Sequence, residues 1–363
     1  MRALADLAEL LRDPGPWCTV HAEVSAGTVT AHEAADLLGQ TVSSALGRAG
    51  ASEADVRAAE TLDWPAAGIG GPASRFVLIR AGEVVVNQLV PGTPKTLVAE
   101  AGPIANLVPL ATVRGADVEY LVVEAERADA EIGRHRASAL GPADRRELHG
   151  ETDSLTKVPL GGYSQGKYQH RTEEIWRRNG AEVAAEVNRL VEDGGVQLVV
   201  LAGDERARLK VQGALSERAA GLVQTVGKNA SAGADRARFE QEVDAVVAGV
   251  AARRQREALE RLVAGLGSYT AGGWAETLRA LQEARVETLL LSPEVAEGRT
   301  LLALGAEPWV AQEESDSLGA PVLGPAAAAP ALLRAAVLTR ADTVLFPPGA
   351  LDSGEAAAAL LRW

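Results

Sequence analysis

The chain has 363 residues, of which 47% are hydrophobic and 23% charged, and its formal net charge is −13 at pH 7. This length predicts three domains at roughly 100 to 200 residues each, and no segment approaches the ~18 apolar residues of a membrane span. The acidity argues against a whole surface that binds nucleic acid, because neutralising phosphates requires clustered Lys and Arg.

The first domain is expected to span residues 1–145 and to be α+β. Residues 1 to about 62 carry apolar positions at helical spacing, and Asp6, Glu9 and Asp13 within that spacing argue against a signal peptide. We therefore expect a cytoplasmic protein. The short β-branched runs RFVLIR, EVVVNQLV and VEYLVVEAE then predict strands. A polar stretch with Gly141 and Pro142 is expected to be a linker.

The second domain is expected at residues 146–265, where strands and helices alternate as in an α/β layer. A strand leads to the pair Gly161–Gly162, a helix is predicted from about Glu173 to Val191, and VQLVVLAG reads as the next strand. A long helix with a polar break at Arg253–Glu257 closes this domain and leads into the third.

The third domain, residues 266–363, has the pattern of a small α/β sandwich. Its segments WAETLRALQEARVETLLLS and ALLRAAVLTRADTVLF contain helical spacing followed by strand-like runs, and SGEAAAALLRW is predicted to be a last helix.

Most sequence patterns that could indicate an enzyme are incomplete in this chain. In GIGGPAS, Pro72 follows Gly71 directly, so the order of a dinucleotide-binding turn is missing. His32 and Glu33 have no second His at metalloprotease spacing, and the single Cys18 excludes an internal disulfide. We therefore predict no cofactor and no metal.

The segment LGGYSQGKYQHRTEEIWRRNG is different, because glycine pairs occur where a loop turns sharply or presses against another molecule. A tight strand-to-helix turn is the simplest interpretation. However, residues 157–178 carry a net charge of +3 in an otherwise acidic chain, from Lys157, Lys167, Arg171, Arg177 and Arg178 against Glu173 and Glu174.

The order Gly-Gly, Ser, aromatic and Arg in this segment resembles the Gly-Gly-Gln loop of the archaeal and eukaryotic peptide-release factors, which form one superfamily with Pelota. WAETLRALQEARVETLLLSPE and SGEAAAALLRW resemble parts of the C-terminal domain of the same superfamily. The resemblance covers residues from about 120 to 363, and it is closest to bacterial members that act in dormancy and ribosome hibernation. It implies a three-domain, release-factor-like α/β and α+β architecture with an exposed Gly-Gly loop on the middle domain.

The resemblance also implies partners and site residues. The first domain would lie toward the decoding site, the middle domain would reach the peptidyl transferase centre, and the third would dock elongation factor Tu or another translational GTPase. The loop expected to bind rRNA or tRNA consists of Gly161, Gly162, Tyr163, Ser164, Gln165, Lys167, Tyr168, His170 and Arg171.

Two departures from the family bear on the mechanism. Tyr163 stands where release factors have the Gln that positions water, and a phenol can stack on a base but imitates an amide poorly. The stop-codon-reading motifs of the family do not occur in residues 1–145.

We therefore expect a non-enzymatic ribosome hibernation factor that blocks the ribosomal A site. One alternative is a peptidyl-tRNA hydrolase or a tRNA-cleaving rescue factor that uses Gln165 or Arg171. Another is a stress-related binding protein that shares only the fold and never meets the ribosome.

Overall fold

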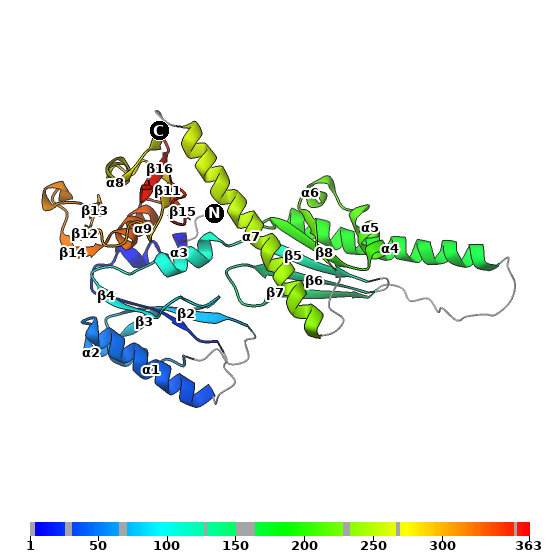
Figure 1. Cartoon of the computed structure of the whole chain (residues 1–363), viewed down its shortest axis with the longest axis horizontal. Helices are drawn as coiled ribbons and strands as arrows, with labels where there is room; N and C mark the ends of the chain where they lie inside the picture. The colour runs from blue at the N-terminus through cyan, green and yellow to red at the C-terminus, as the bar shows by residue number, and fades with distance from the viewer. Residues whose placement is uncertain are drawn as a thin grey trace. The chain divides into compact units, whose positions relative to one another are not determined.

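The structure is a computed structural model that describes residues 4–25, 31–64, 71–126, 129–149, 164–227, 233–265, 269–351 and 354–363. The chain forms two compact units (Figure 1). Unit 1 comprises Met1–Asp117 and Arg253–Trp363, and unit 2 comprises Val118–Ala252.

The N-terminal part of unit 1 is built around an antiparallel sheet with the strand order β3-β2-β1-β4. Two short 3₁₀ helices, at Ala5–Leu7 and Leu10–Arg12, precede the sheet. Its elements in chain order are β1 (Trp17–Glu23), α1 (Ala31–Arg48), α2 (Glu53–Glu60), β2 (Ala73–Arg80), β3 (Glu83–Pro91), β4 (Val98–Gly102) and α3 (Val108–Gly115).

The helical prediction for residues 1–62 is wrong at β1. This strand lies between β2 and β4, and its side chains from Trp17 to Ala22 are buried. Cys18, Val20 and Ala22 alternate with Thr19, His21 and Glu23, which is the period-2 pattern that indicates a strand, so a local signal for β1 is present in the sequence and the helical prediction does not use it.

The C-terminal part of unit 1 contains two small sheets, with the orders β10-β16-β11-β15 and β13-β12-β14. Its elements are β10 (Thr270–Ala271), α8 (Trp274–Gln282), β11 (Val286–Leu291), β12 (Thr300–Leu304), β13 (Val310–Ala311), a 3₁₀ helix (Glu314–Ser317), β14 (Val322–Ala327), α9 (Ala328–Leu338), β15 (Asp342–Leu345) and β16 (Ala357–Leu361).

The predicted last helix is also wrong, because Ala357–Leu361 form β16. This strand pairs with β10 and β11, and all five of its side chains are buried. Pairing and burial override the helix preference of Ala and Leu here.

The two parts of unit 1 share one hydrophobic core. Trp17, Phe76 and Leu78 of the N-terminal sheet belong to the same buried cluster as Leu289 and Leu332 of the C-terminal part. Thus, where the sequence predicts separate first and third domains, residues 1–117 and 253–363 fold as one unit.

Unit 2 is a five-stranded sheet with the order β7-β6-β5-β8-β9, in which β5, β8 and β9 are parallel. Its elements are β5 (Glu119–Ala125), β6 (Asp129–Arg136), β7 (Pro142–His149), α4 (Ser164–Glu192), β8 (Leu198–Gly203), α5 (Glu205–Gln212), α6 (Glu217–Ala220), β9 (Val223–Thr225) and the first part of α7 (Gly233–Ala264).

Alternate residues of the central strands face opposite helices, as the pleat of a strand requires. Leu121 and Val199 pack in the cluster that contains α4, whereas Val122 and Val200 pack in the cluster that contains α7. The expected boundary at 145/146 falls inside β7, so β5, β6 and the first half of β7, which the sequence assigns to the first domain, belong to unit 2.

Helix α7 is shared by the two units. Phe239 and Val243 pack in unit 2, while Ala258 is buried against Leu290 and Phe346 of unit 1. The division between the units, at Arg253, coincides with the start of the polar break seen in the sequence. Within the described ranges, no helix is long and apolar enough to cross a membrane.

Candidate functional site

The predicted RNA-binding loop connects β7 to α4 in unit 2. Gly161, Gly162 and Tyr163 lie outside the described residues. Helix α4 begins at Ser164, so the backbone is helical where the sequence predicts a loop as far as Arg171 and a helix only from about Glu173. This early start places four further loop residues in the first turns of α4, where their side chains are not described: Gln165, Lys167, Tyr168 and His170.

The described side chains of α4 closest to the loop are exposed or half-buried. Among the described side chains of α4, the first buried one is Asn179, while Ile175 and Trp176 are half-buried. At 1.5 Å per residue, the distance along the helix from Ser164 to Ile175 is roughly 16 Å. Figure 1 shows α4 extending past α5 at this end.

The rest of α4 is held on the sheet by apolar packing. Its buried face consists of Val183, Ala184, Val187, Leu190 and Val191, at spacings of one, three and four residues. This face packs against the side chains of β5, β6 and β8 in one cluster.

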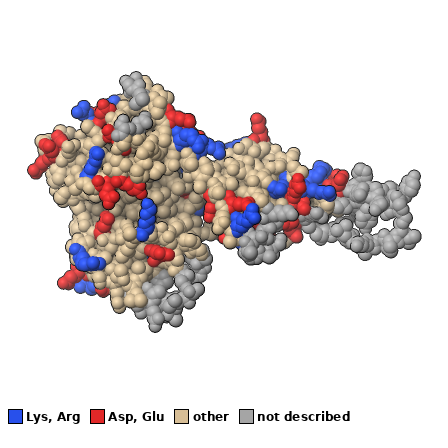
Figure 2. All heavy atoms as spheres, viewed as in Figure 1, with Lys and Arg blue, Asp and Glu red and all other residues tan. Residues whose placement is uncertain are grey.

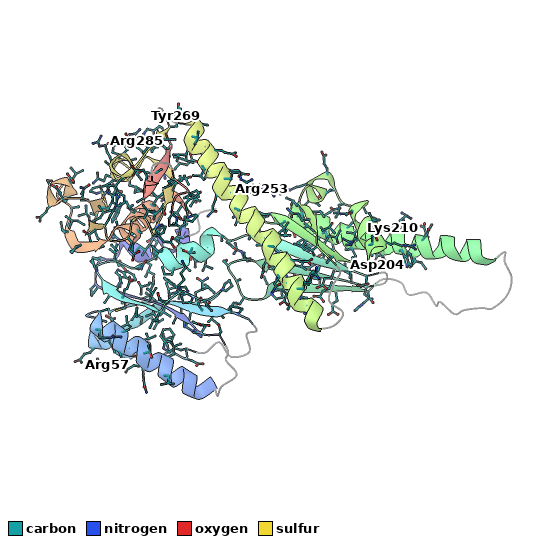
Figure 3. The ribbon with its side chains drawn as sticks, viewed as in Figure 1. Arg57, Asp204, Lys210, Arg253, Tyr269 and Arg285 are labelled. Atoms are coloured by element: carbon teal, nitrogen blue, oxygen red, sulfur yellow. The ribbon has the colours of Figure 1, made fainter. Side chains whose placement is uncertain are left out.

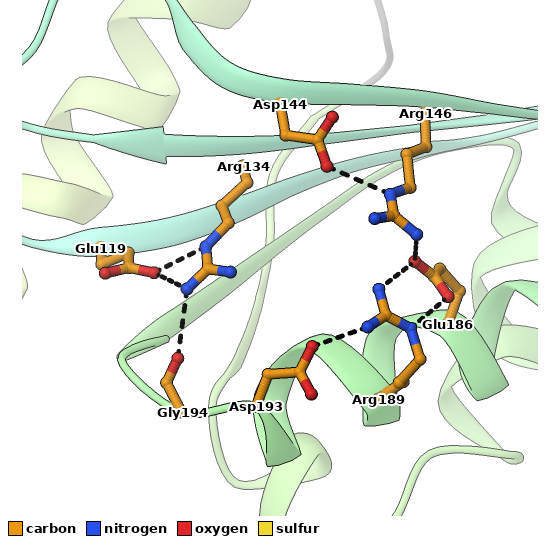
Figure 4. A network of polar contacts seen from close by, with 8 residues as sticks. All are labelled: Glu119, Arg134, Asp144, Arg146, Glu186, Arg189, Asp193 and Gly194. Atoms are coloured by element: carbon orange, nitrogen blue, oxygen red, sulfur yellow. Dashed lines mark hydrogen bonds and ion pairs between the residues drawn. The ribbon is translucent and has the colours of Figure 1, made fainter.

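Polar contacts fix the position of α4 relative to β7, the strand that precedes the loop (Figure 4). The carboxylate of Glu186 accepts a hydrogen bond from Nη1 of Arg146 at 2.6 Å, and Arg146 also contacts Asp144 at 3.1 Å. Arg189 donates to Glu186 at 2.7 and 2.9 Å and to Asp193 at 2.6 Å. Glu186 therefore connects the strand before the loop to the helix after it.

The two arginines stabilise the charged form of Glu186. Hydrogen bonding by Arg189 lowers the pKa of Glu186 most, and Arg146 lowers it further. The reciprocal contact raises the pKa of Arg189 above its ordinary value. A second, separate set of polar contacts involves Arg134, which donates to Glu119 at 2.7 Å and to the carbonyl of Gly194 at 3.2 Å.

The described part of the predicted basic segment is partly neutralised. Arg177 donates to Glu174 at 2.6 Å on the exposed surface of α4, and this contact lowers the pKa of Glu174. The net charge of +3 already includes Glu174, and the structure shows that this carboxylate is paired with Arg177 within α4.

Helices α5 and α6 pack beside α4. A methyl group at Gly180 would lie 2.7 Å from Cβ of Lys210, so only glycine permits this close approach of α5. Asn188 of α4 accepts a hydrogen bond from the backbone N–H of Ser216, the N-cap of α6, at 2.9 Å.

A pocket lies between α4, α5 and the connection from β5 to β6. It is lined mainly by Trp176, Asn179 and Val183 of α4, by Ala207 and Val211 of α5, by Glu126 directly after β5, and by Asp129 at the start of β6. Throughout the described ranges, no group of three or more His, Cys, Asp and Glu residues has the arrangement of a metal site.

The sequence of this unit matches a known family. Residues 119–268 match the family described as bacterial archaeo-eukaryotic release factor family 2. The match begins at the first residue of β5, where the sheet of unit 2 begins, and it includes the Gly-Gly pair. The chain is release-factor-like over these residues.

Curated relatives of the release-factor-like chain come from Mycobacterium tuberculosis. The uncharacterized proteins Rv2629 (strain H37Rv) and MT2704 (strain CDC 1551) are each 26% identical to it over 285 residues, which is 76% of this chain and 74% of each relative.

Solved structures with some similarity include Archaeoglobus fulgidus Pelota, with 18% identity, a TM-score of 0.35 and coverage of 80% of this chain and 79% of that one. Dom34 of S. cerevisiae has 9% identity and a TM-score of 0.39, with 80% of each chain covered. The release-factor resemblance of the chain rests on the family match of residues 119–268.

Proposed function

We propose that this protein is a ribosome-binding hibernation factor that occupies the A site without reading a stop codon and without hydrolysing peptidyl-tRNA. Its middle domain directs the Gly161–Gly162 loop toward the rRNA of the peptidyl transferase centre. The observation that carries the proposal is the family match of residues 119–268, combined with Tyr163 in the position of the release-factor Gln.

The chemistry of Tyr163 favours binding over hydrolysis. A phenol has a pKa of about 10, so it is neutral near pH 7 and acts as a single O–H donor or acceptor. It cannot present the paired carbonyl and NH₂ groups with which an amide orients water. Its aromatic face can stack on a nucleobase, a contact of roughly 1–3 kcal/mol.

The contacts within unit 2 support the proposal that the Gly161–Gly162 loop is the tip of a rigid base formed by β7 and α4. The ion pairs of Glu186 with Arg146 and Arg189 join β7 to α4, the two elements that flank the loop. A base held by both packing and ion pairs reduces the conformational entropy lost when the tip binds. A blocking factor benefits directly, because it needs affinity and not turnover.

A protein partner for the C-terminal part of unit 1, elongation factor Tu or another translational GTPase, belongs to the same proposal. The proposed site has no role for a cofactor or a metal. We also propose that the site has no catalytic group. Gln165 and Arg171, the residues that an enzyme of this kind would use, have no catalytic role in this proposal.

The deciding experiment compares Tyr163→Ala with Gln165→Ala, and uses Tyr269→Ala as the matched control. Tyr269 is 62% exposed and lies in unit 1, so its substitution removes the same side chain far along the chain. Affinity for purified bacterial 70S ribosomes and release of peptide from peptidyl-tRNA are both measured.

We expect Tyr163→Ala to weaken ribosome binding by the roughly 1–3 kcal/mol of one stacking contact, and the other two variants to bind like the natural protein. Neither the natural protein nor any of the three variants should release peptide from peptidyl-tRNA. Release that depends on Gln165 would instead establish the hydrolase alternative, because a group that acts in the transition state changes rate more than affinity.

A further inference from the structure

The exposed face of α5 carries cations that have no ion pair with any described residue. Arg206 and Lys210 are exposed, as is Leu209 at 58%, whereas Ala207 and Val211 line the pocket next to α4. Arg206 and Lys210 are four residues apart, so they are neighbours on the helix surface. Figure 3 labels Lys210 where α5 meets α4, and Figure 2 shows Lys and Arg side chains there beside acidic ones.

This lack of partners distinguishes α5 from the sheet, α4 and α7 of unit 2, although Arg218 of α6 likewise has no ion pair with a described residue. Arginines on the sheet, on α4 and on α7 contact carboxylates of the same unit, and these include Arg134, Arg145, Arg146, Arg189, Arg236 and Arg238. In a chain with 49 acidic and 36 basic residues, such pairing is the expected state of an arginine.

Two carboxylates precede Arg206 in the sequence. Glu205, the first residue of α5, is exposed and has no ion pair with a described residue, while Asp204 is engaged at the helix N-terminus. As the N-cap of α5, Asp204 accepts hydrogen bonds from the backbone N–H groups of Arg206 and Ala207 at 2.9 and 3.2 Å. This contact satisfies helix N–H groups, and the side chain of Arg206 forms no ion pair with a described residue. Gly180 in turn lets Lys210 lie beside α4, so the charges of α5 are presented next to the helix that begins at the proposed RNA-binding loop.

We propose that the face of α5 formed by Arg206, Leu209 and Lys210 is a second RNA contact surface, which binds the phosphate backbone. This inference rests on the proposed function and adds a binding site to it. Lys is depleted at the cores of protein interfaces and aromatic residues are enriched there, whereas this face has a Lys and no aromatic residue. Lys and Arg that lack protein carboxylates can neutralise phosphates and release their counterions.

The test uses the full-length double variant Arg206→Glu/Lys210→Glu. Its matched control is Arg57→Glu/Lys95→Glu, which makes the same change of charge at exposed positions of unit 1. Affinity for purified bacterial 70S ribosomes and for a short RNA hairpin is measured at several salt concentrations. Melting curves establish that both variants are folded, as expected for changes at exposed side chains.

We expect the α5 variant to bind both RNAs more weakly, with a log–log salt slope reduced by about 1 for each lost phosphate contact. The control should keep the slope of the natural protein. An unchanged slope for the α5 variant on both probes overturns the inference. A second result would also overturn the inference. If polyglutamate competes for the α5 face and the RNA hairpin does not, the face has a protein partner.

The two ligands separate this inference from the proposed function. If the natural protein does not bind ribosomes but binds the hairpin through α5, the hibernation proposal fails and the RNA surface stands. If it binds ribosomes with no contribution from α5, the hibernation proposal survives and the RNA surface is rejected.

Discussion

Replacement of Glu186 by Ala should loosen α4 from β7. The carboxylate of Glu186 is 16% exposed and contacts Arg146 at 2.6 Å and Arg189 at 2.7 Å, each of which is 44% exposed. Hydrogen bonds to charged groups contribute roughly 1.5–3 kcal/mol each when well formed, but pairs with exposed partners contribute only about 0–1 kcal/mol. With a shielded carboxylate and half-exposed arginines, we expect a total loss of about 1–2 kcal/mol.

The substitution should destabilise α4 locally as well as lower the free energy of unfolding of the whole unit. Hydrogen exchange of the α4 amides should become faster in Glu186→Ala, because α4 loses its polar tie to β7 and keeps its apolar packing. Glu182→Ala is the matched control, since Glu182 is an exposed residue on the same helix with no ion pair to a described residue. Both substitutions make the same change in helix propensity, so their difference isolates the ion pairs.

The pH dependence provides a second readout. Because the pKa of Glu186 is lowered in the folded protein, its stabilisation is present above the ordinary Glu pKa of about 4.3. It is lost as the pH falls through the folded value. The difference in stability between the natural protein and Glu186→Ala should therefore shrink in acid. Equal stability and equal exchange of the Glu186 and Glu182 variants near pH 7 would refute the reasoning.

Two further predictions concern the cores of the units. Gly203→Ala should destabilise unit 2 by about 3–5 kcal/mol, combining backbone strain with overpacking, because its Cβ would lie 2.0 Å from the carbonyl oxygen of Ala125 at a φ of +109°. Gly213→Ala, with its nearest neighbour at 3.4 Å, should change the denaturation midpoint far less, and equal midpoints would contradict the clash. Arg334→Met should speed hydrogen exchange around Leu11, because buried Arg334 donates to the Leu11 carbonyl at 3.2 Å, whereas the exposed-site control Arg279→Met should not. Burial lowers the pKa of Arg334 to about 10, so raising the pH through that value should stabilise the natural protein relative to Arg334→Met.

The sequence predicts the elements whose signals are local. The run VQLVVLAG forms β8, and the long helix with the polar break forms α7. Strand β16 is missed because its conformation is decided by a distant partner, whereas β1 is missed although its sequence alternates between apolar and polar residues. β16 consists of Ala and Leu, which favour helix, and it becomes a strand only because β11 pairs with it about 70 residues away in the sequence.

The same distinction applies to the candidate site. The glycine pair and Tyr163 are readable from the sequence, and so is the helical spacing of Glu174 and Arg177. The contact of Glu186 with Arg146 joins residues 40 positions apart and depends on the packing of α4 against β7. The sequence gives the number of charged residues, but it does not show which cations form ion pairs with carboxylates on other elements of the fold.

A chain with a net charge of −13 can still approach RNA, because electrostatic interactions in solution are local. At physiological ionic strength the screening length is about 8 Å, so distant carboxylates contribute little to the potential at α5. What matters is whether a cation has a carboxylate within a few ångströms. Among the described residues, Arg206 and Lys210 form no ion pair and are available for phosphates, while Arg177 and Arg189 are already engaged. A surface built from so few cations should show a shallow salt dependence, which makes the slope a sensitive measure of each contact.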